Sequence, residues 1–208
     1  MIRILLVDDH PVVRRGIRQV LIDGFKTVHV GEARDVASGM ATFRRDTWDV
    51  VIVDMTLPDG SGLDLLKKIR GEQPAQAILV LSVHPSAQFA WRAVAAGASR
   101  YLTKDSAATE LVQAIEQIRR SGQPGSRARG WSPPATHLTG AAHEALSDRE
   151  YQVLRMLGSG RTVSEIGAAL HLSVKTVSTY RTRVLEKMQM RSTAEIMRYV
   201  IENRLTDL

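Results

Sequence analysis

Val50-Val51-Ile52-Val53-Asp54 is an apolar, β-branched run that ends in a carboxylate, and the Pro- and Gly-containing segment 55–62 follows it at once. A run of this kind predicts a strand buried on both faces, as in a parallel sheet covered by helices. Asp54 then lies at the carboxyl end of the strand. In open α/β sheets, ligands bind in the crevice outside that edge.

A second predicted strand, Ile4 to Val7, ends in the same way, in Asp8 and Asp9. Three acids at one sheet edge repel each other unless a cation lies among them. The alternative is that these acids are solvated loop residues. Two apolar strands that end alike, each followed by a helix signal, favour the cation site.

Residues 1–120 alternate five times between strand and helix patterns. The strands are predicted at 4–7, 27–32, 50–54, 77–82 and 100–103, and the helices at 11–24, 35–45, 61–70, 86–96 and 106–119. This alternation predicts an α/β fold, a doubly wound parallel sheet with right-handed crossovers and helices on both faces.

The predicted strand ends add a hydroxyl, Ser82, and a cation, Lys104, to the three acids. Carboxylate oxygens suit Mg²⁺, and a carboxylate beside Mg²⁺ can act as the nucleophile toward a phosphoryl group, giving an acyl phosphate. Lys104 and Ser82 are suited to hold the added phosphate oxygens by charge and by hydrogen bond. Taken alone, Lys104 is more simply a solvated surface lysine.

Composition narrows the class of protein. The 208 residues predict one or two domains, and the absence of cysteine excludes disulfides and thiolate metal sites. The N-terminus lacks a signal-peptide core and no run is long enough to span a bilayer, so a cytoplasmic protein without a membrane partner is expected.

The net charge of +6 is uneven along the chain. Residues 121–208 carry 12 Lys and Arg against 8 Asp and Glu, whereas residues 1–120 carry 16 against 14. The basic excess in the C-terminal part is a mild indication of a polyanionic partner, and it also fits an ordinary surface.

Glycines and prolines break every periodicity between residues 121 and 145, which predicts a flexible linker. Arg127 and Arg129 are interpreted as solvated charges rather than phosphate contacts. Trp131 is expected to dock on one of the two domains.

Four helix starts follow the linker. Ser147, Thr162 and Ser192 each precede a glutamate by three residues, the capping-box spacing, and Ser173 provides a fourth cap. Only about four residues, 171–174, separate the second helix from the third. This spacing predicts a small all-α domain with a helix-turn-helix.

The third helix of this domain has two faces. Residues at helical spacing are predicted to face the core: Val174, Val177, Val184, Leu185 and Met188. The other side carries cations and small hydroxyls, and we predict that it contacts DNA through Lys175, Thr176, Ser178, Thr179, Arg181, Thr182 and Arg183. The alternative is a plain basic surface helix.

Residues 1–120 resemble the flavodoxin-like receiver domain of two-component response regulators. The motifs that carry the resemblance are Asp8-Asp9, Asp54 with 57–62, Leu81-Ser82, Ala96-Gly97-Ala98 and Tyr101-Leu102-Thr103-Lys104-Asp105. One departure is Asp105, where many receivers have proline.

The resemblance implies that Asp54 accepts phosphate from the phosphohistidine of a sensor histidine kinase, and that Asp8, Asp9, Asp54 and the Thr56 backbone carbonyl hold Mg²⁺. It further implies that Ser82 and Tyr101 form a switch pair, in which the hydroxyl closes on the phosphate and the ring rotates inward. For Tyr101 the alternative is ordinary packing.

Residues 146–208 resemble the LuxR-type helix-turn-helix of NarL/FixJ response regulators. The motifs are Leu146 to Glu150, Gly158, Ile166 to Leu170, Leu172 to Val177, and Lys187-Met188 with Arg191. Tyr180 departs from the histidine of many members. The resemblance implies promoter DNA as a partner, RNA polymerase as a further one, and a homodimer of the phosphorylated protein through the fourth helix, Ser192 to Asn203.

We therefore expect a phosphorylation-dependent transcription regulator, with no enzymatic activity beyond Mg²⁺-dependent phosphoryl acceptance and slow self-dephosphorylation. One alternative is a phosphoaspartyl phosphohydrolase, which generally needs a second acid where this chain has Thr56. Two others are a constitutive DNA binder with a vestigial receiver and a protein-binding receiver whose C-terminal helices only dimerise.

Overall fold

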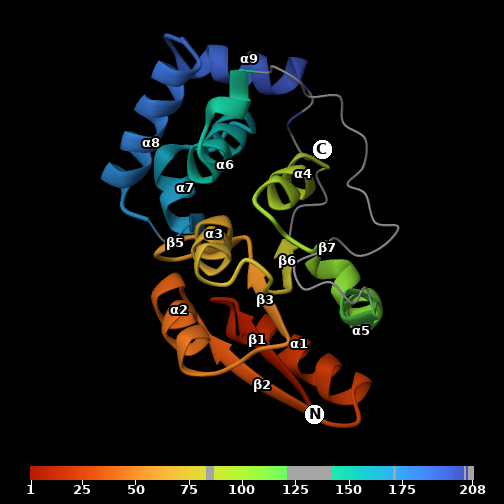
Figure 1. The fold of residues 1–208 in the computed structure, drawn as a ribbon. Helices are drawn as coiled ribbons and strands as arrows, with labels where there is room; N and C mark the ends of the chain where they lie inside the picture. The colour runs from red at the N-terminus through yellow and green to blue at the C-terminus, as the bar shows by residue number, and fades with distance from the viewer. Residues whose placement is uncertain (83–86, 121–141, 171, 204, 206–208) are drawn as a thin grey trace. The chain divides into compact units, whose positions relative to one another are not determined.

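The computed structural model describes residues 1–82, 87–120, 142–170, 172–203 and 205 (Figure 1). The chain divides into two compact units, Met1–Thr136 and His137–Leu208. Within the described residues, none of the helices combines the length and apolar character that crossing a membrane requires. The predicted linker, with Arg127, Arg129 and Trp131, falls outside the described residues except for 142–145.

The first unit contains a five-stranded parallel sheet in the order β2-β1-β3-β6-β7. Its strands are β1 (Ile2–Val7), β2 (Val28–Ala33), β3 (Val50–Asp54), β6 (Ile78–Ser82) and β7 (Arg100–Thr103). Its helices are α1 (Pro11–Gly24), α2 (Val36–Arg45), α3 (Gly62–Glu72), α4 (Ala87–Ala95) and α5 (Lys104–Arg120). The strand order reverses at β1, which opens a ligand crevice between β1 and β3.

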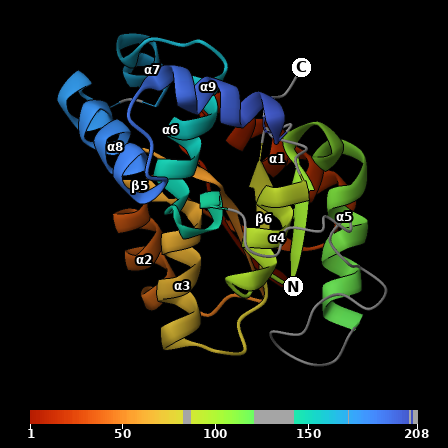
Figure 2. The same ribbon diagram turned by 90° about the horizontal axis from the view of Figure 1, so that it is seen from above.

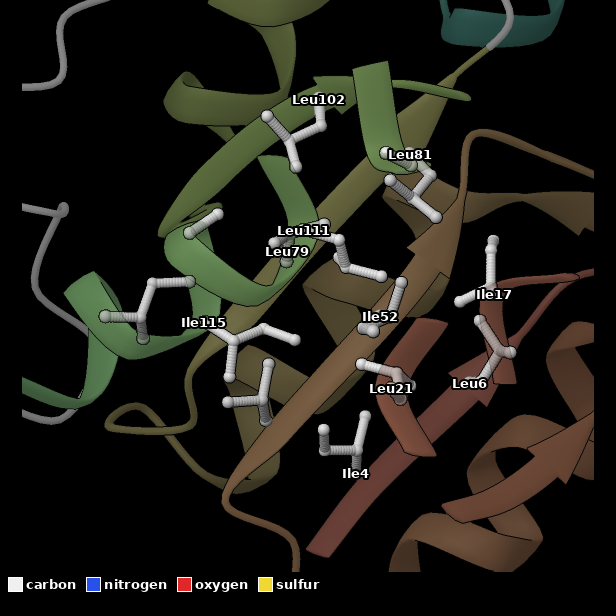
Figure 3. Packing of buried hydrophobic residues seen from close by; sticks show 14 of the residues in the cluster. Ile4, Leu6, Ile17, Leu21, Ile52, Leu79, Leu81, Leu102, Leu111 and Ile115 are labelled. Carbon is white, nitrogen blue, oxygen red and sulfur yellow. The ribbon is translucent and has the colours of Figure 1, made fainter. Parts of the chain in front are cut away.

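The sheet is buried as its sequence predicts. Every residue of β3 and β6 is buried, which is the environment expected for continuous apolar runs. Helices α1 and α5 cover one face, and their side chains, including Ile17, Leu21, Leu111 and Ile115, pack on the strands in one cluster (Figure 3).

The predicted strands and helices of residues 1–120 all form, with ends that differ by two residues or fewer. The helix expected from Ser106 begins instead at Lys104. A short antiparallel ribbon, β4 (Thr56–Leu57) and β5 (Gly60–Ser61), was not predicted. Its strands are two residues long, too short for a periodic pattern.

The second unit is helical (Figure 2). It consists of the 3₁₀ helix η1 (Ala142–Ala145), α6 (Asp148–Gly158), α7 (Val163–Leu170), α8 (Val174–Lys187) and α9 (Thr193–Glu202). The side chains of Ser147, Ser173 and Ser192 accept hydrogen bonds from the backbone of the first turns of α6, α8 and α9, as predicted. The helix-turn-helix is formed by α7 and α8.

One core prediction for α8 is wrong. Val177, Val184 and Met188 are buried, but Val174 is 52% exposed, and Leu185 is only partly buried. Helical spacing assigns a side chain to a face, but it does not show where along the helix the packing partner ends. Val174 is the first residue of α8 and lies beyond the packed part of that face.

Candidate functional site

An acidic pocket lies at the carboxyl edge of the sheet. Strands β1 and β3 are neighbours, so the acids that follow β1 meet the acid that ends β3. One ligand atom from each of Asp8, Asp9, His10 and Asp54 lies within 4.8 Å of the others. Asp8 and Asp54 are buried and Asp9 is partly exposed. These acids are therefore not solvated loop residues.

Lys104 reaches into this pocket from the first turn of α5. Its Nζ lies 2.7 Å from Oδ2 of Asp54 and 2.8 Å from Oδ2 of Asp8. The side chain of Lys104 is 9% exposed, which excludes a solvated surface lysine. One ammonium group thus pairs with two of the three carboxylates.

The pocket shifts the pKa of both partners. Burial raises the pKa of Asp54 to about 6; Lys104 acts against this increase and Asp8 adds to it. For Lys104, burial opposes the charge, but Asp54 and Asp8 outweigh burial and raise the pKa above its ordinary value. The three carboxylates exceed the single ammonium charge, so the pocket favours a further cation.

The donor atoms fit a divalent metal ion. Oδ2 of Asp8 and Oδ1 of Asp9 are buried and accept no hydrogen bond of good geometry, although Lys104 and His10 lie close to them. The backbone N–H of Thr56 lies 3.4 Å from Oδ1 of Asp54, which brings the Thr56 backbone to the pocket. Hard oxygen donors of this kind suit Mg²⁺.

His10 is a pocket residue that the sequence patterns did not predict. Its Nδ1 lies 2.6 Å from Oδ1 of Asp9, and its backbone N–H donates to Oδ1 of Asp8 over 2.7 Å. The signal was its position directly after the two acids and before Pro11. His10, whose side chain is about half exposed, thus contacts both carboxylates.

The segment 55–62 has a structural explanation. Both carboxylate oxygens of Asp59 accept hydrogen bonds from the first backbone N–H groups of α2, those of Val36 and Ala37. A Cβ atom at Gly62 would lie 2.0 Å from the carbonyl oxygen of Asp54, so only glycine fits there. The segment therefore fixes the backbone around Asp54.

Ser82 and Tyr101 come from the neighbouring strands of the same sheet. Ser82 ends β6 and is buried; in register it pairs with Thr103, and Leu81 pairs with Asp54. Tyr101 is buried on β7, with 7% of the residue exposed. The ring lies inward, which fits both the switch role and ordinary packing.

The predicted DNA-contacting residues of α8 fall into two groups. Five are exposed: Lys175, Ser178, Thr179, Thr182 and Arg183. Thr176 and Arg181 are partly buried and make contacts within the unit, Thr176 with Ser173 at 2.8 Å and Arg181 through Nε with Oγ1 of Thr193 at 2.9 Å. The exposed group carries positive charge and hydroxyls, with an acid only at Glu186.

Comparison with known proteins agrees with this geometry. Residues 4–116 match the family described as "Response regulator receiver domain", and residues 144–200 match "Bacterial regulatory proteins, luxR family". The chain belongs to the response regulators. Its C-terminal unit is a LuxR-type DNA-binding domain, so the resemblance to the NarL/FixJ group is confirmed.

Characterised relatives cover nearly the whole chain. The response regulator UvrY of Escherichia coli K12 is 35% identical over 211 residues, 99% of this chain and 96% of UvrY. The response regulator GacA of Pseudomonas aeruginosa is 33% identical over 219 residues, 100% of this chain and 99% of GacA. DevR/DosR of Mycobacterium tuberculosis, a DNA-binding transcriptional activator, is 34% identical over 195 residues, 91% of this chain and 89% of that protein.

Solved structures show the same two-domain architecture. RcsB of Salmonella typhimurium matches with a TM-score of 0.64 and 25% identity over 97% of each chain. RcsB from Salmonella enterica, bound to promoter P1flhDC in the presence of the phosphomimetic BeF3⁻, matches with a TM-score of 0.60 and 25% identity over 96% of this chain and 98% of RcsB.

These relatives confirm the predicted flavodoxin-like fold and the expectation of a transcription regulator. UvrY and GacA are both named as response regulators, which favours regulation over the phosphohydrolase alternative.

Proposed function

We propose that Asp54 is the phosphoacceptor of this response regulator and that a sensor histidine kinase is the donor. The observation that carries the proposal is the pairing of buried Asp54 with Lys104 at 2.7 Å beside two further acids. A carboxylate oxygen of Asp54 attacks the phosphorus, the P–N bond to the kinase histidine breaks, and the imidazole leaves as the acyl phosphate forms. The positively charged ammonium group of Lys104 then pairs with the phosphoryl oxygens.

Mg²⁺ is the proposed cofactor, and Asp8, Asp9, Asp54 and the Thr56 carbonyl are its proposed ligands. When bound, the ion supplies positive charge to a pocket that holds more carboxylates than ammonium groups. The buried oxygens of Asp8 and Asp9, which accept no hydrogen bond of good geometry, support this assignment.

Ser82 and Tyr101 are the proposed switch pair. Ser82 ends the strand next to Asp54 and is suited to donate a hydrogen bond to the phosphoryl group. That bond is made only in the phosphorylated state, so it provides the differential stabilisation that a population shift needs. Tyr101 lies inward on the next strand, and its ring is proposed to rotate when the Ser82 hydroxyl moves onto the phosphoryl group.

The DNA-binding function is assigned to the exposed stripe of α8. Lys175, Ser178, Thr179 and Thr182 are suited to bond base edges, and Arg183 to bond phosphates. Thr176 and Arg181 complete the predicted set from partly buried positions. The related RcsB of Salmonella enterica is bound to a promoter, which supports double-stranded promoter DNA as the partner here.

The domain boundaries proposed are those predicted: a receiver over 1–120, a linker over 121–145 and the DNA-binding domain over 146–208.

Phosphorylation promotes a homodimer through α9, in keeping with the RcsB dimers bound to DNA in a related structure. RNA polymerase is a further proposed partner, and the cytoplasm, which holds the promoter, is the proposed location.

Acyl-phosphate labelling combined with DNA binding tests the proposal. The purified chain is treated with acetyl phosphate and Mg²⁺, and its affinity for a duplex selected by the protein from a random library is measured by fluorescence anisotropy. We expect a phosphate on Asp54, located by mass spectrometry, and tighter binding. An Asp54→Asn protein that still responds to the donor would overturn the assignment.

A further inference from the structure

Lys104 is held differently from the other residues of the pocket. Among the described residues, Asp8, Asp9, His10, Asp54 and Ser82 lie on strands or in the loop after β1, whereas Lys104 is the first residue of a helix. Strand β7 ends at Thr103 and α5 begins at Lys104 with no residue between them. The placement of Lys104 therefore depends on how the first turn of α5 is fixed.

Thr103 fixes that turn. The backbone N–H of Ser106 donates to the Thr103 hydroxyl over 3.1 Å, the bond from the third helical residue to the N-cap side chain. The Ser106 hydroxyl in turn donates to the Thr103 carbonyl oxygen over 3.3 Å. Thr103 is also held by the sheet, because it pairs with Ser82 on β6. One residue thus joins the sheet edge to the helix that carries Lys104.

We propose that Thr103 is a positioning residue for phosphoryl acceptance, because its hydroxyl cap fixes the backbone of Lys104 and keeps the ammonium group on Asp54 and Asp8. The inference rests on the proposed function of Asp54. The lysine stem has four rotatable carbons, and its Nζ must meet two carboxylate oxygens, at 2.7 and 2.8 Å. A frayed first turn would leave the stem free to sample positions away from the acids.

A simpler role for Thr103 is to stabilise α5 as any cap does. The two roles differ in their coupling to Lys104. If Thr103 acts through Lys104, the loss of the cap has no further effect on phosphorylation once the ammonium group is gone. If Thr103 only stabilises the helix, the two losses add.

The test measures the initial rate of Asp54 phosphorylation of the full chain by acetyl phosphate at saturating Mg²⁺. Thr103→Val keeps the shape and removes the hydroxyl, and we expect a rate about fivefold lower, the rate equivalent of one helix cap. Thr103→Ser and Thr103→Asn restore a cap and are expected to restore the rate. The affinity for Mg²⁺, measured by titration, should not change, because Thr103 is not a ligand.

The decisive comparison repeats Thr103→Val in a Lys104→Met background, where the substitution should change the rate less than about twofold. Asp35→Ala is the matched control, because it removes the N-cap of α2 in the same unit, and it should leave the rate unchanged. An equal effect of Thr103→Val in both backgrounds, or no effect in either, refutes the positioning role. A wild-type chain that acquires no phosphate on Asp54 refutes the proposed function instead.

Discussion

The acidic pocket and the exposed stripe of α8 use charge in opposite ways. In the pocket, the ammonium group of Lys104 lies 2.8 Å from buried Asp8 and 2.7 Å from buried Asp54, so the three charges depend on one another. On α8, Lys175 and Arg183 are exposed, and salt would screen each of their proposed interactions with DNA. Substitutions in the pocket should therefore have large and coupled effects, and substitutions on the stripe smaller and additive ones.

The largest effect is expected at the backbone beside Asp54. In Gly62→Ala, the new methyl group would meet the Asp54 carbonyl oxygen at 2.0 Å, so the receiver must distort. We expect a loss of about 3 kcal/mol or more in the free energy of unfolding of this unit, measured by urea denaturation. Gly16→Ala is the control, because a methyl group there meets nothing within 4 Å and α1 should gain about 0.5–1 kcal/mol.

The next effect concerns the buried charge of Asp54. The pKa of Asp54 is raised from 3.8 to about 6. The stability that the protonated carboxyl group contributes is therefore fully present below pH 3.8 and is lost as the pH rises through about 6. Asp54→Asn should therefore stabilise the receiver by about 1–2 kcal/mol at neutral pH in EDTA, less than the full shift because the pair with Lys104 is lost.

Urea denaturation at about pH 7.5 and about pH 4 checks this expectation. The gain should shrink toward zero at the lower pH, and saturating Mg²⁺ should shrink it at the higher pH by stabilising the wild-type carboxylate. A variant that is less stable than wild type in EDTA at neutral pH would show that the pair with Lys104 outweighs burial.

The sequence patterns predicted the acids of the pocket better than they predicted the residues that hold the pocket in place. Asp8, Asp9 and Asp54 follow apolar runs, and strand adjacency in a parallel sheet brings such residues together without further information. The role of Asp59 depends on contacts with a separate helix, which no local pattern encodes. His10 and Thr103 contact residues that are near in sequence, but the pattern alone does not show that these contacts support the pocket. On α8, spacing identified the exposed face but could not show that Arg181 bonds to Thr193 on α9.

Substitutions on the exposed stripe of α8 should each change the affinity for DNA by a smaller amount. Arg183→Ala removes one exposed positive charge, and we expect about 1 kcal/mol weaker binding to the selected duplex and a salt dependence whose slope falls by about 1. Arg181→Ala is the comparison. The Arg181 side chain is partly buried and bonds to Thr193, so its removal should also lower the stability of the second unit. Equal salt slopes for Arg183→Ala and wild type would remove Arg183 from the phosphate contacts.

The smallest effect is expected at a buried acid of the second unit. Burial acts to raise the pKa of Glu150, but Lys187, at 2.7 Å, and the cap with Ser147 outweigh it and lower the pKa below 4.5. The contribution of this carboxylate is therefore present above pH 4.5 and lost as the pH falls through the lowered value. Lys187→Met should cost less than about 1 kcal/mol at neutral pH, because Lys187 is partly exposed.

Acid titration of the second unit, followed by circular dichroism, measures this contribution. The midpoint of unfolding should move to higher pH in Lys187→Met, whereas Lys175→Met, on the exposed stripe, should leave it in place. An unchanged midpoint in both variants would show that the Ser147 cap alone sets the pKa of Glu150.

Helix α5 is a rod of 17 residues, about 25 Å long at 1.5 Å per residue. Its first residue, Lys104, contacts the acids of the pocket, and its last residue is Arg120. A tilt of about 5° around Lys104 would carry the far end through roughly 2 Å over that length. A tilt about this pivot would leave the ammonium group of Lys104 beside Asp54 and Asp8 while the far end of the helix moves.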